Sequence, residues 1–397
     1  MFGLIPAEHW DYNISDIYRG LIGALGHRRN QGQLNIEGLG KCIPIRSARS
    51  GILVALKALN LPAGARIGAP LYCCPVVFKA IKAAGFRVRF IDVERDTLCM
   101  SASDLLAKNA QLDAVIAVHM FGNLCDMRRL KQAAQGKPIV EDCAQSLGSK
   151  IDGQMVGAFG DIAVFSFRSG KFLSVGEGGA IFSKHRDIFA RLIQLTSALP
   201  VPGCIEDCTH VVKTYLRSML RTKPFWGIVG HRLWSLYNKS TDFLEKSPIV
   251  TSQIFRSDIT ITVDRLSTLD FSIKQQRANA DYYSKFANLG SHMLCDERPN
   301  VFYNRYLYPI IFPSGDDRDF ISAYLYERRI STMQPYKDIA EIAARYYDYT
   351  GDCPVAEQIA KRVLTIPSHH ALKEIELRRI TECLNSGWNE NLKCLSR

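Results

Sequence analysis

Short apolar segments alternate with helical segments between Arg46 and Ser183, and this alternation restricts the fold more than any other feature of the chain. A helical pattern, with apolar residues three and four positions apart, falls on residues 50–59, 76–84 and 126–135. Strand-like apolar segments fall on residues 66–70, 87–93, 114–119, 137–141, 162–167 and 180–182. This order predicts an α/β fold in three layers, α/β/α, with a mainly parallel sheet.

The pattern changes near residue 250, and a chain of 397 residues usually folds as more than one domain. Residues 1–250 are predicted to form a large domain, which includes a basic and aromatic insertion at about residues 200–248. Residues 251–397 are predicted to form a smaller α+β domain. Its expected helices are residues 277–286, 317–328 and 372–384, and its expected strands are residues 306–312 and 363–366.

The composition is that of a globular protein, with 47% hydrophobic and 22% charged residues and no apolar run long enough to cross a bilayer. The N-terminus has no signal-peptide pattern, and the twelve cysteines are scattered, which favours reduced thiols in the cytoplasm. We therefore expect no metal site. The net charge of +11 suits an anionic substrate or surface, but no nucleic-acid-binding motif accompanies it.

Polar residues follow the strands at points where the carboxyl ends of a parallel sheet would meet. Asp142 ends one apolar segment, Ser166 ends the next, Lys171 follows in a turn, and residues 176–180 form a glycine-rich return. An aldehyde cofactor with a pyridine ring and a phosphate requires such groups. An amine forms the Schiff base, a carboxylate keeps the ring nitrogen protonated, and small donors hold the phosphate.

The spacing of these residues resembles that of a known family. Residues 141–145, 166–171 and 176–180 match the motifs E-D-x-A-Q, S-F-x-x-x-K and G-E-G-G-A of the DegT/StrS group of sugar aminotransferases, which are pyridoxal phosphate enzymes of fold type I. Weaker similarity extends from residue 43 to the C-terminus. The resemblance implies pyridoxal 5'-phosphate as cofactor and a homodimer whose active site lies at the subunit interface.

The resemblance also implies a role for each matching residue. Lys171 would form the Schiff base and move the proton between substrate and cofactor, and Asp142 would face the ring nitrogen. Gln145 would lie near the phenolic oxygen, and Ser166 would bind the phosphate. His119, in a strand-end motif of the family, is expected to be structural.

Three departures from the family concern the cofactor. Ser47, Ala48 and Arg49 replace a Ser-Gly-Thr turn at a helix start, where backbone N–H groups form a phosphate cradle. Arg49 either adds a charge-assisted contact or points into solvent. Cys74 stands at the position of the ring-stacking aromatic, so either Tyr72 stacks on the ring, or the cofactor packs on the thiol, or Tyr72 is a core residue.

Two further departures concern the neighbouring subunit and the substrate. Residues 249–254 lack the asparagine that reaches the partner's cofactor phosphate in the family, and Ser252 and Gln253 are the candidates to replace it. Residues 332–337 replace a histidine-containing loop that shapes the substrate pocket. The second change predicts an unusual substrate.

The resemblance implies transfer of an amino group from an amino acid, glutamate, to a nucleotide-linked keto sugar, in the biosynthesis of cell-surface polysaccharides or secondary metabolites. Three alternatives stay open: the same chemistry on a lipid-linked or other non-nucleotide keto substrate at a membrane surface, a non-catalytic cofactor-binding regulatory protein, and a sugar dehydratase of the same fold. The dehydratases carry histidine in place of Lys171, so the lysine argues against the last.

Basic and aromatic residues recur between Lys213 and Lys239. One interpretation of this pattern is an amphipathic helix that makes a peripheral contact with an anionic membrane surface. The alternative is that the aromatic residues cover the core or a dimer interface.

Overall fold

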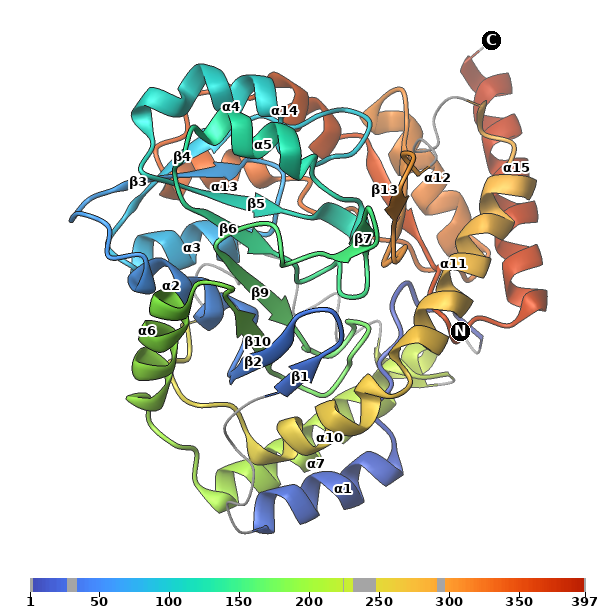
Figure 1. The fold of residues 1–397 in the computed structure, drawn as a ribbon. Helices are drawn as coiled ribbons and strands as arrows, with labels where there is room; N and C mark the ends of the chain where they lie inside the picture. Colours follow the sequence, from blue (N-terminus) through green and yellow to red (C-terminus); the bar gives the residue numbers. More distant parts are fainter. Residues whose placement is uncertain (1–2, 27–33, 224, 231–247, 291–296, 396–397) are drawn as a thin grey trace.

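An eight-stranded sheet forms the centre of the molecule (Figure 1), in the order β1-β2-β10-β9-β6-β5-β3-β4. The computed structural model describes residues 3–26, 34–223, 225–230, 248–290 and 297–395. The strands of this sheet are β1 (Leu34–Ile36), β2 (Gly40–Ile45), β3 (Arg66–Pro70), β4 (Arg87–Ile91), β5 (Ala114–Val118), β6 (Ile139–Asp142), β9 (Ile162–Ser166) and β10 (Gly179–Phe182). Strands β4, β3, β5, β6 and β9 run parallel, and β10, β2 and β1 continue antiparallel.

Helices flank this sheet, which confirms the predicted fold class (Figure 1). The helices are α1 (Ile14–Leu25), α2 (Ala48–Ala58), α3 (Val76–Ala83), α4 (Ala102–Lys108), α5 (Met127–Ala134), α6 (Arg186–Ser197), α7 (Cys204–Arg221), α10 (Arg256–Leu266), α11 (Leu269–Phe286), α12 (Gly315–Glu327), α13 (Ile339–Tyr346), α14 (Pro354–Ala360) and α15 (Glu374–Leu395), with short turns η1 (Asn109–Gln111), η2 (Met120–Gly122) and η3 (Trp226–Gly230). In the described part of the chain, no helix has both the length and the apolar character of a bilayer span.

Local sequence explains the central elements well. All five residues of β5 are buried, as expected for a strand covered on both faces. Ser47 caps α2: its hydroxyl accepts from the backbone N–H of Ser50, whose own hydroxyl accepts from the N–H of Ser47. The N-terminal region differs from expectation, because the antiparallel hairpin β1–β2 and helix α1 were not predicted there.

A second, smaller core lies in the C-terminal part. It gathers around the two-stranded sheet of β12 (Tyr308–Ile311) and β13 (Val363–Ile366), beside α12 and α15, and includes Ile5 from the N-terminus. Helices α13 and α14 instead pack into the core of the large sheet. The boundary between residues 250 and 251 stays a prediction. A separate three-stranded sheet joins β7 (Lys150–Ile151) to β8 (Gln154–Met155) and β11 (Val301–Phe302).

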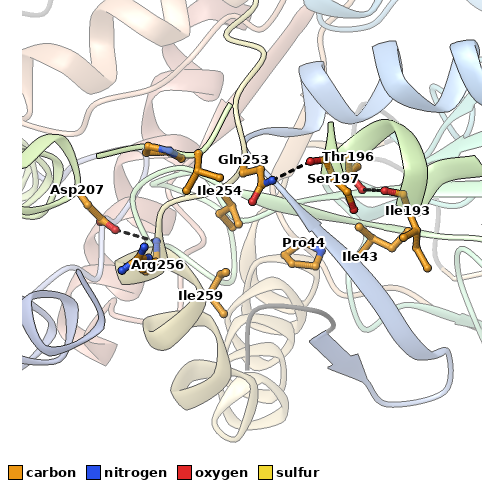
Figure 2. Close-up of a pocket in the computed structure, with 12 residues that line it drawn as sticks. Ile43, Pro44, Ile193, Thr196, Ser197, Asp207, Gln253, Ile254, Arg256 and Ile259 are labelled. Atoms are coloured by element: carbon orange, nitrogen blue, oxygen red, sulfur yellow. Dashed lines mark hydrogen bonds between the residues drawn. The ribbon is translucent and has the colours of Figure 1, made fainter. Parts of the chain in front are cut away.

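The segment before α10 is held against the end of α6. The side-chain amide of Gln253 donates to the carbonyl of Ser197 at 3.4 Å (Figure 2). It also donates to the carbonyl of Leu199 at 3.2 Å. Ile43, Pro44 and Ile254 line a pocket around this amide. None of the residues predicted to bind the cofactor of their own chain lines that pocket, whereas Gln253, a candidate to reach the partner's cofactor, does.

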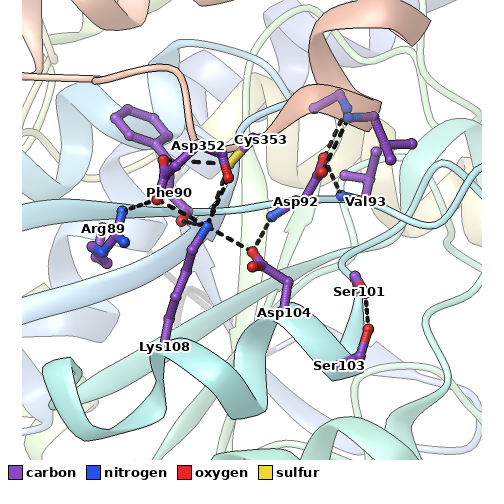
Figure 3. A network of polar contacts seen from close by, with 12 residues as sticks. Arg89, Phe90, Asp92, Val93, Ser101, Ser103, Asp104, Lys108, Asp352 and Cys353 are labelled. Atoms are coloured by element: carbon purple, nitrogen blue, oxygen red, sulfur yellow. Dashed lines mark hydrogen bonds and ion pairs between the residues drawn. The ribbon is translucent and has the colours of Figure 1, made fainter.

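Asp92 joins the end of β4 to the C-terminal part of the chain (Figure 3). Its carboxylate accepts hydrogen bonds from the backbone N–H groups of Val355 at 3.0 Å and Ala356 at 2.8 Å, in the first turn of α14. Beside it, the ammonium of Lys108 bridges Asp104 at 2.8 Å and Asp352 at 3.1 Å. Asp92 therefore has a structural explanation and lies apart from the motif residues.

We expect Asp92→Ala to lower the free energy of unfolding by about 2 kcal/mol, because it leaves one buried and one partly buried N–H group at a helix start without an acceptor. Urea unfolding followed by circular dichroism measures the change. Asp96→Ala, at an exposed site on the following loop, is the matched control. Equal unfolding midpoints for the two variants would contradict this role.

Candidate active site

Lys171 lies in the turn that follows β9. The backbone N–H of Lys171 donates to the carbonyl of Arg168 at 3.0 Å, and Gly170 has a φ of +89°. A side chain at position 170 would come within 3.0 Å of the Trp10 indole nitrogen, so glycine is required. The ammonium of Lys171 is 4.4 Å from the centre of the Tyr306 ring. Burial and the nearby charge of Arg168 lower the pKa of Lys171 to about 8.

Asp142 ends β6 and is 6% exposed. One carboxylate oxygen accepts from the backbone N–H of Ala144 at 3.0 Å, and no other hydrogen bond joins this carboxylate to the described residues. Burial raises its pKa, while the Ala144 N–H and the positive charge of Lys171 act in the opposite direction. A positively charged ring nitrogen would favour the ionised carboxylate further.

The start of α2 lies against the glycine-rich return. Ser47 pairs with Gly178, and Ser166 lies opposite Gly179 in the register of β9 and β10. A Cβ atom at position 179 would lie 2.2 Å from the Phe165 carbonyl oxygen and 3.4 Å from the Ala48 nitrogen. Glycine thus allows Ser166 and the start of α2 to lie close together, where the first N–H groups of the helix have no intrahelical acceptor.

Two arginines accompany this helix start. Arg49 is half-buried and Arg168 is exposed, and neither forms an ion pair or a side-chain hydrogen bond with the described residues. Burial and the positive charge of Arg168 lower the pKa of Arg49. The two guanidinium groups are therefore close enough to interact, and their positive charges make this end of the site attractive to a phosphate.

Gln145 is buried, and its side-chain oxygen accepts from the backbone N–H of Phe121 at 2.9 Å. Its amide nitrogen is 3.5 Å from the Tyr336 hydroxyl. Tyr336 belongs to the segment that replaces the family's histidine-containing loop, so that segment contributes to this side of the site.

The structure does not bring the ring of Tyr72 to the site. Tyr72 is fully buried, its hydroxyl donates to the Pro335 carbonyl at 3.1 Å, and its ring meets those of Phe121 and Tyr336 edge to face. This burial fits the interpretation of Tyr72 as a core residue, and the identity of the ring-stacking residue stays a prediction. Cys74, by contrast, is half-buried, and the positive charges of Arg168, Lys171 and Arg49 act on its pKa, which burial raises.

His119 holds the sheet together. Its Nε2 lies 3.1 Å from Glu141 Oε2, and its Nδ1 accepts from the backbone N–H of Cys125 at 3.2 Å. Burial alone would raise the pKa of Glu141, but hydrogen bonds from His119 and the N–H groups of Gly157 and Gly160 hold it below its ordinary value. Both nitrogens of His119 are thus occupied by the protein, which gives it a structural role.

Sequence reasoning missed the N-terminal segment that lies beside Lys171. Glu8 and His9 line a small pocket together with Lys171, Tyr306 and His369. Glu8 also lies 3.7 Å from Arg221, at the end of α7. The sequence offered no signal, because these residues come from distant positions without a motif.

The chain is similar in sequence and in fold to known aminotransferases. The family model described as the DegT/DnrJ/EryC1/StrS aminotransferase family matches residues 35–212 and 242–385. GDP-perosamine synthase of Escherichia coli O157:H7 is 25% identical over 345 residues, which cover 85% of this chain and 83% of that protein. The L-glutamine:2-deoxy-scyllo-inosose aminotransferase of Streptomyces fradiae is 31% identical over 207 residues, 49% of this chain and 48% of that protein. A solved sugar aminotransferase from Micromonospora echinospora superposes with a TM-score of 0.73 at 21% identity, covering 97% of this chain and 100% of that chain.

We expect Lys171 to react with small aldehydes at lower pH than an ordinary lysine. Only the neutral amine is nucleophilic, and a pKa of about 8 leaves about half of the Lys171 amines neutral at pH 8. Reductive methylation with formaldehyde at graded pH, followed by peptide mass spectrometry, measures the profile. Exposed Lys150 is the internal reference. Identical profiles for Lys171 and Lys150 would contradict the lowered pKa.

Proposed function

Because the chain belongs to the DegT/DnrJ/EryC1/StrS aminotransferase family, we propose that it is a pyridoxal phosphate-dependent enzyme that transfers an amino group from an amino acid to a keto sugar. One observation carries the proposal for this chain. Lys171, with a lowered pKa, and buried Asp142 lie within electrostatic reach of each other at the carboxyl edge of a parallel sheet.

The residues at this edge fit the cofactor. Lys171 supplies the amine, Asp142 has an oxygen without a hydrogen bond from the described residues, and Ser166 with the start of α2 supplies donors for a phosphate. When bound, pyridoxal 5'-phosphate supplies an exchangeable carbonyl group and a ring that accepts electrons. Gln145, fixed by the Phe121 N–H, would stand beside the ring's phenolic oxygen.

Lys171, Asp142 and Tyr306 would each have a separate role in the proposed reaction. The Nζ of Lys171 would move a proton from the amino-acid carbon to the cofactor carbon in the first half of the exchange, and in the opposite direction in the second half, as a general base and acid of suitable pKa. The carboxylate of Asp142 holds a proton on the ring nitrogen. Tyr306 borders Lys171 from one side, and its hydroxyl donates to the Gly170 carbonyl at 3.0 Å, which fixes the turn.

The names of the relatives indicate the chemical class of the acceptor but not the compound itself. One relative is named for a GDP-linked sugar and another for a keto cyclitol with glutamine as the named donor. We propose a nucleotide-linked keto sugar as acceptor and glutamate as donor, with a homodimer in the cytoplasm as the working form. The segment around Tyr336 differs from the family loop, so a lipid-linked or other non-nucleotide keto acceptor is the second candidate.

The half-reaction with glutamate tests the catalytic proposal. The cofactor-loaded protein is expected to show the visible absorbance of lysine-bound cofactor, to lose it on addition of glutamate, and to release 2-oxoglutarate. Lys171→Ala removes the amine and is expected to lower turnover at least about 1,000-fold and to abolish that absorbance. Lys150→Ala, at an exposed lysine, is the control.

Turnover by Lys171→Ala at the wild-type rate would overturn the assignment of the lysine. A wild-type protein that binds the cofactor but yields no 2-oxoglutarate or other keto acid with any amino donor would favour the non-catalytic regulatory protein. Nucleotide-linked keto sugars and the corresponding lipid-linked or free keto compounds are then offered to the aminated form. Amine transfer to one class alone identifies the acceptor.

Arg49 and Arg168 are expected to hold the cofactor phosphate from within the same chain. Gln253, a candidate to replace the neighbouring-subunit asparagine, already donates to Ser197 and Leu199 of its own chain. Arg49→Gln and Arg168→Gln should each weaken pyridoxal 5'-phosphate binding about tenfold or more, because a charge-assisted hydrogen bond is lost. Affinity for pyridoxal, which lacks the phosphate, should stay unchanged.

Fluorescence titration of the apoenzyme with both compounds measures this difference. The control is Arg128→Gln, at an exposed arginine on α5. If the Arg49 and Arg168 variants weaken pyridoxal and pyridoxal 5'-phosphate equally, the two arginines do not recognise the phosphate.

A further inference from the structure

Helices α1 and α7 each carry an apolar stripe that points away from the protein core. The stripe on α1 includes Ile14 and Tyr18, which are 72% and 70% exposed, and the stripe on α7 includes Ile205, which is 84% exposed. We call these residues together the α1–α7 outer face. It consists of Ile14, Tyr18, Ile22, Leu25, Ile205, Val212, Leu216 and Leu220.

The spacing places each stripe opposite the buried side of its helix. On α1 the exposed positions 14, 18, 22 and 25 recur at helical intervals, and the buried positions 16, 20 and 24 lie on the other side. On α7 the exposed positions 205, 212, 216 and 220 lie opposite the buried positions 207, 211, 214 and 218. Both helices are therefore apolar on the side that faces water.

The inner sides of both helices are already occupied. A Cβ atom at Gly20 would lie 2.9 Å from Val211 of α7, and one at Gly23 would lie 2.4 Å from Thr260 of α10, so α1 packs tightly against both helices, at the outer edge of the molecule (Figure 1). On α7, Ser218 donates to the Trp10 carbonyl at 2.7 Å. Within the described residues, both helices therefore pack against the protein through the side opposite the outer face.

Basic side chains accompany the apolar stripe on α7. Lys213 and Arg217 are exposed, and neither forms an ion pair with the described residues. Glu206 is the single exposed acidic residue of α7, and Asp16 of α1 is buried against Arg265 at 2.6 Å. The surroundings of the stripe are therefore cationic, in a chain whose net charge is +11.

We propose that the α1–α7 outer face lies on an anionic lipid membrane surface. Helices with an apolar side and flanking Lys or Arg residues lie in the plane of the headgroups, with the apolar side inserted and the cations near lipid phosphates. A second copy of the chain fits less well, because a twofold contact through these stripes would bring Lys213 and Arg217 of both copies together with little acid to compensate.

This surface differs from the one that the sequence predicted between Lys213 and Lys239. Helix α7 ends at Arg221, and Trp226 is buried, with Arg221 4.8 Å from its ring. The apolar side begins at Ile205, eight positions before Lys213, and continues with exposed Phe225 and Ile228 after the helix. Residues 231–239 lie outside the described part of the chain.

Co-sedimentation of the full-length holoenzyme with vesicles tests the proposal. The vesicles contain phosphatidylcholine alone or phosphatidylcholine with phosphatidylglycerol. We expect wild-type protein to bind the anionic vesicles and to be released by high salt. Lys213→Gln with Arg217→Gln should weaken binding about fivefold for each basic residue removed, or about 30-fold for the pair.

Removal of the apolar stripes should have the larger effect. Val212→Gln with Leu216→Gln, and separately Tyr18→Gln with Ile22→Gln, should each weaken vesicle binding by on the order of 100-fold. The matched control is Ile375→Gln with Leu392→Gln, which makes the same change at exposed apolar residues of α15. Circular dichroism and the visible absorbance of the cofactor report whether each variant is folded.

Light scattering without lipid distinguishes a membrane-binding role of the α1–α7 outer face from binding to a second protein. The proposal expects the same oligomeric state for wild-type protein and for the folded stripe variants. It is overturned if wild-type protein does not bind anionic vesicles, if it binds neutral vesicles equally well, if the stripe variants bind like the control, or if these variants dissociate an oligomer.

Discussion

The buried carboxylate of Glu141 fixes the edge of the sheet on which the candidate site is built. It accepts hydrogen bonds from His119 after β5 and from the backbone of Gly157 and Gly160 before β9, so one side chain joins three consecutive parallel segments. A buried carboxylate without these partners would be strongly unfavourable, which leaves little freedom in the register. Successive side chains of a strand point to opposite faces, so this anchor also sets the direction of Asp142.

Local pattern was sufficient to predict the elements around this anchor. The boundaries of β3 agree with the sequence interpretation, and those of α3, β5 and β9 differ by a single residue, because apolar burial and capping are encoded nearby. The fold class and the family followed from motifs within forty residues of Lys171. Those motifs indicated that Lys171, Asp142 and Ser166 lie at one edge, since strand order and glycine returns leave few alternatives.

Contacts between distant segments were not predictable in the same way. The sequence left open whether Tyr72 stacks on the ring or belongs to the core. Its contacts with Pro335 and Tyr336 decide its surroundings, and no pattern near residue 72 predicts them. Glu8 and Tyr306 are far apart in the sequence, yet both line the same small pocket as Lys171. The sequence pattern suggested an apolar surface around Trp226, after the end of α7, yet that ring is buried and packs on Arg221.

The clamp formed by Asp92 has a consequence for engineering. A chimaera that takes its first 250 residues from this chain and the remainder from a relative would separate this carboxylate from the N–H groups of Val355 and Ala356, 263 and 264 positions further on. It would also remove α13 and α14 from the large core into which they pack. In a working chimaera, residues 339–363 therefore have to come from the same parent as β4 and Asp92. The segment that must be exchanged as one piece is thus discontinuous along the chain.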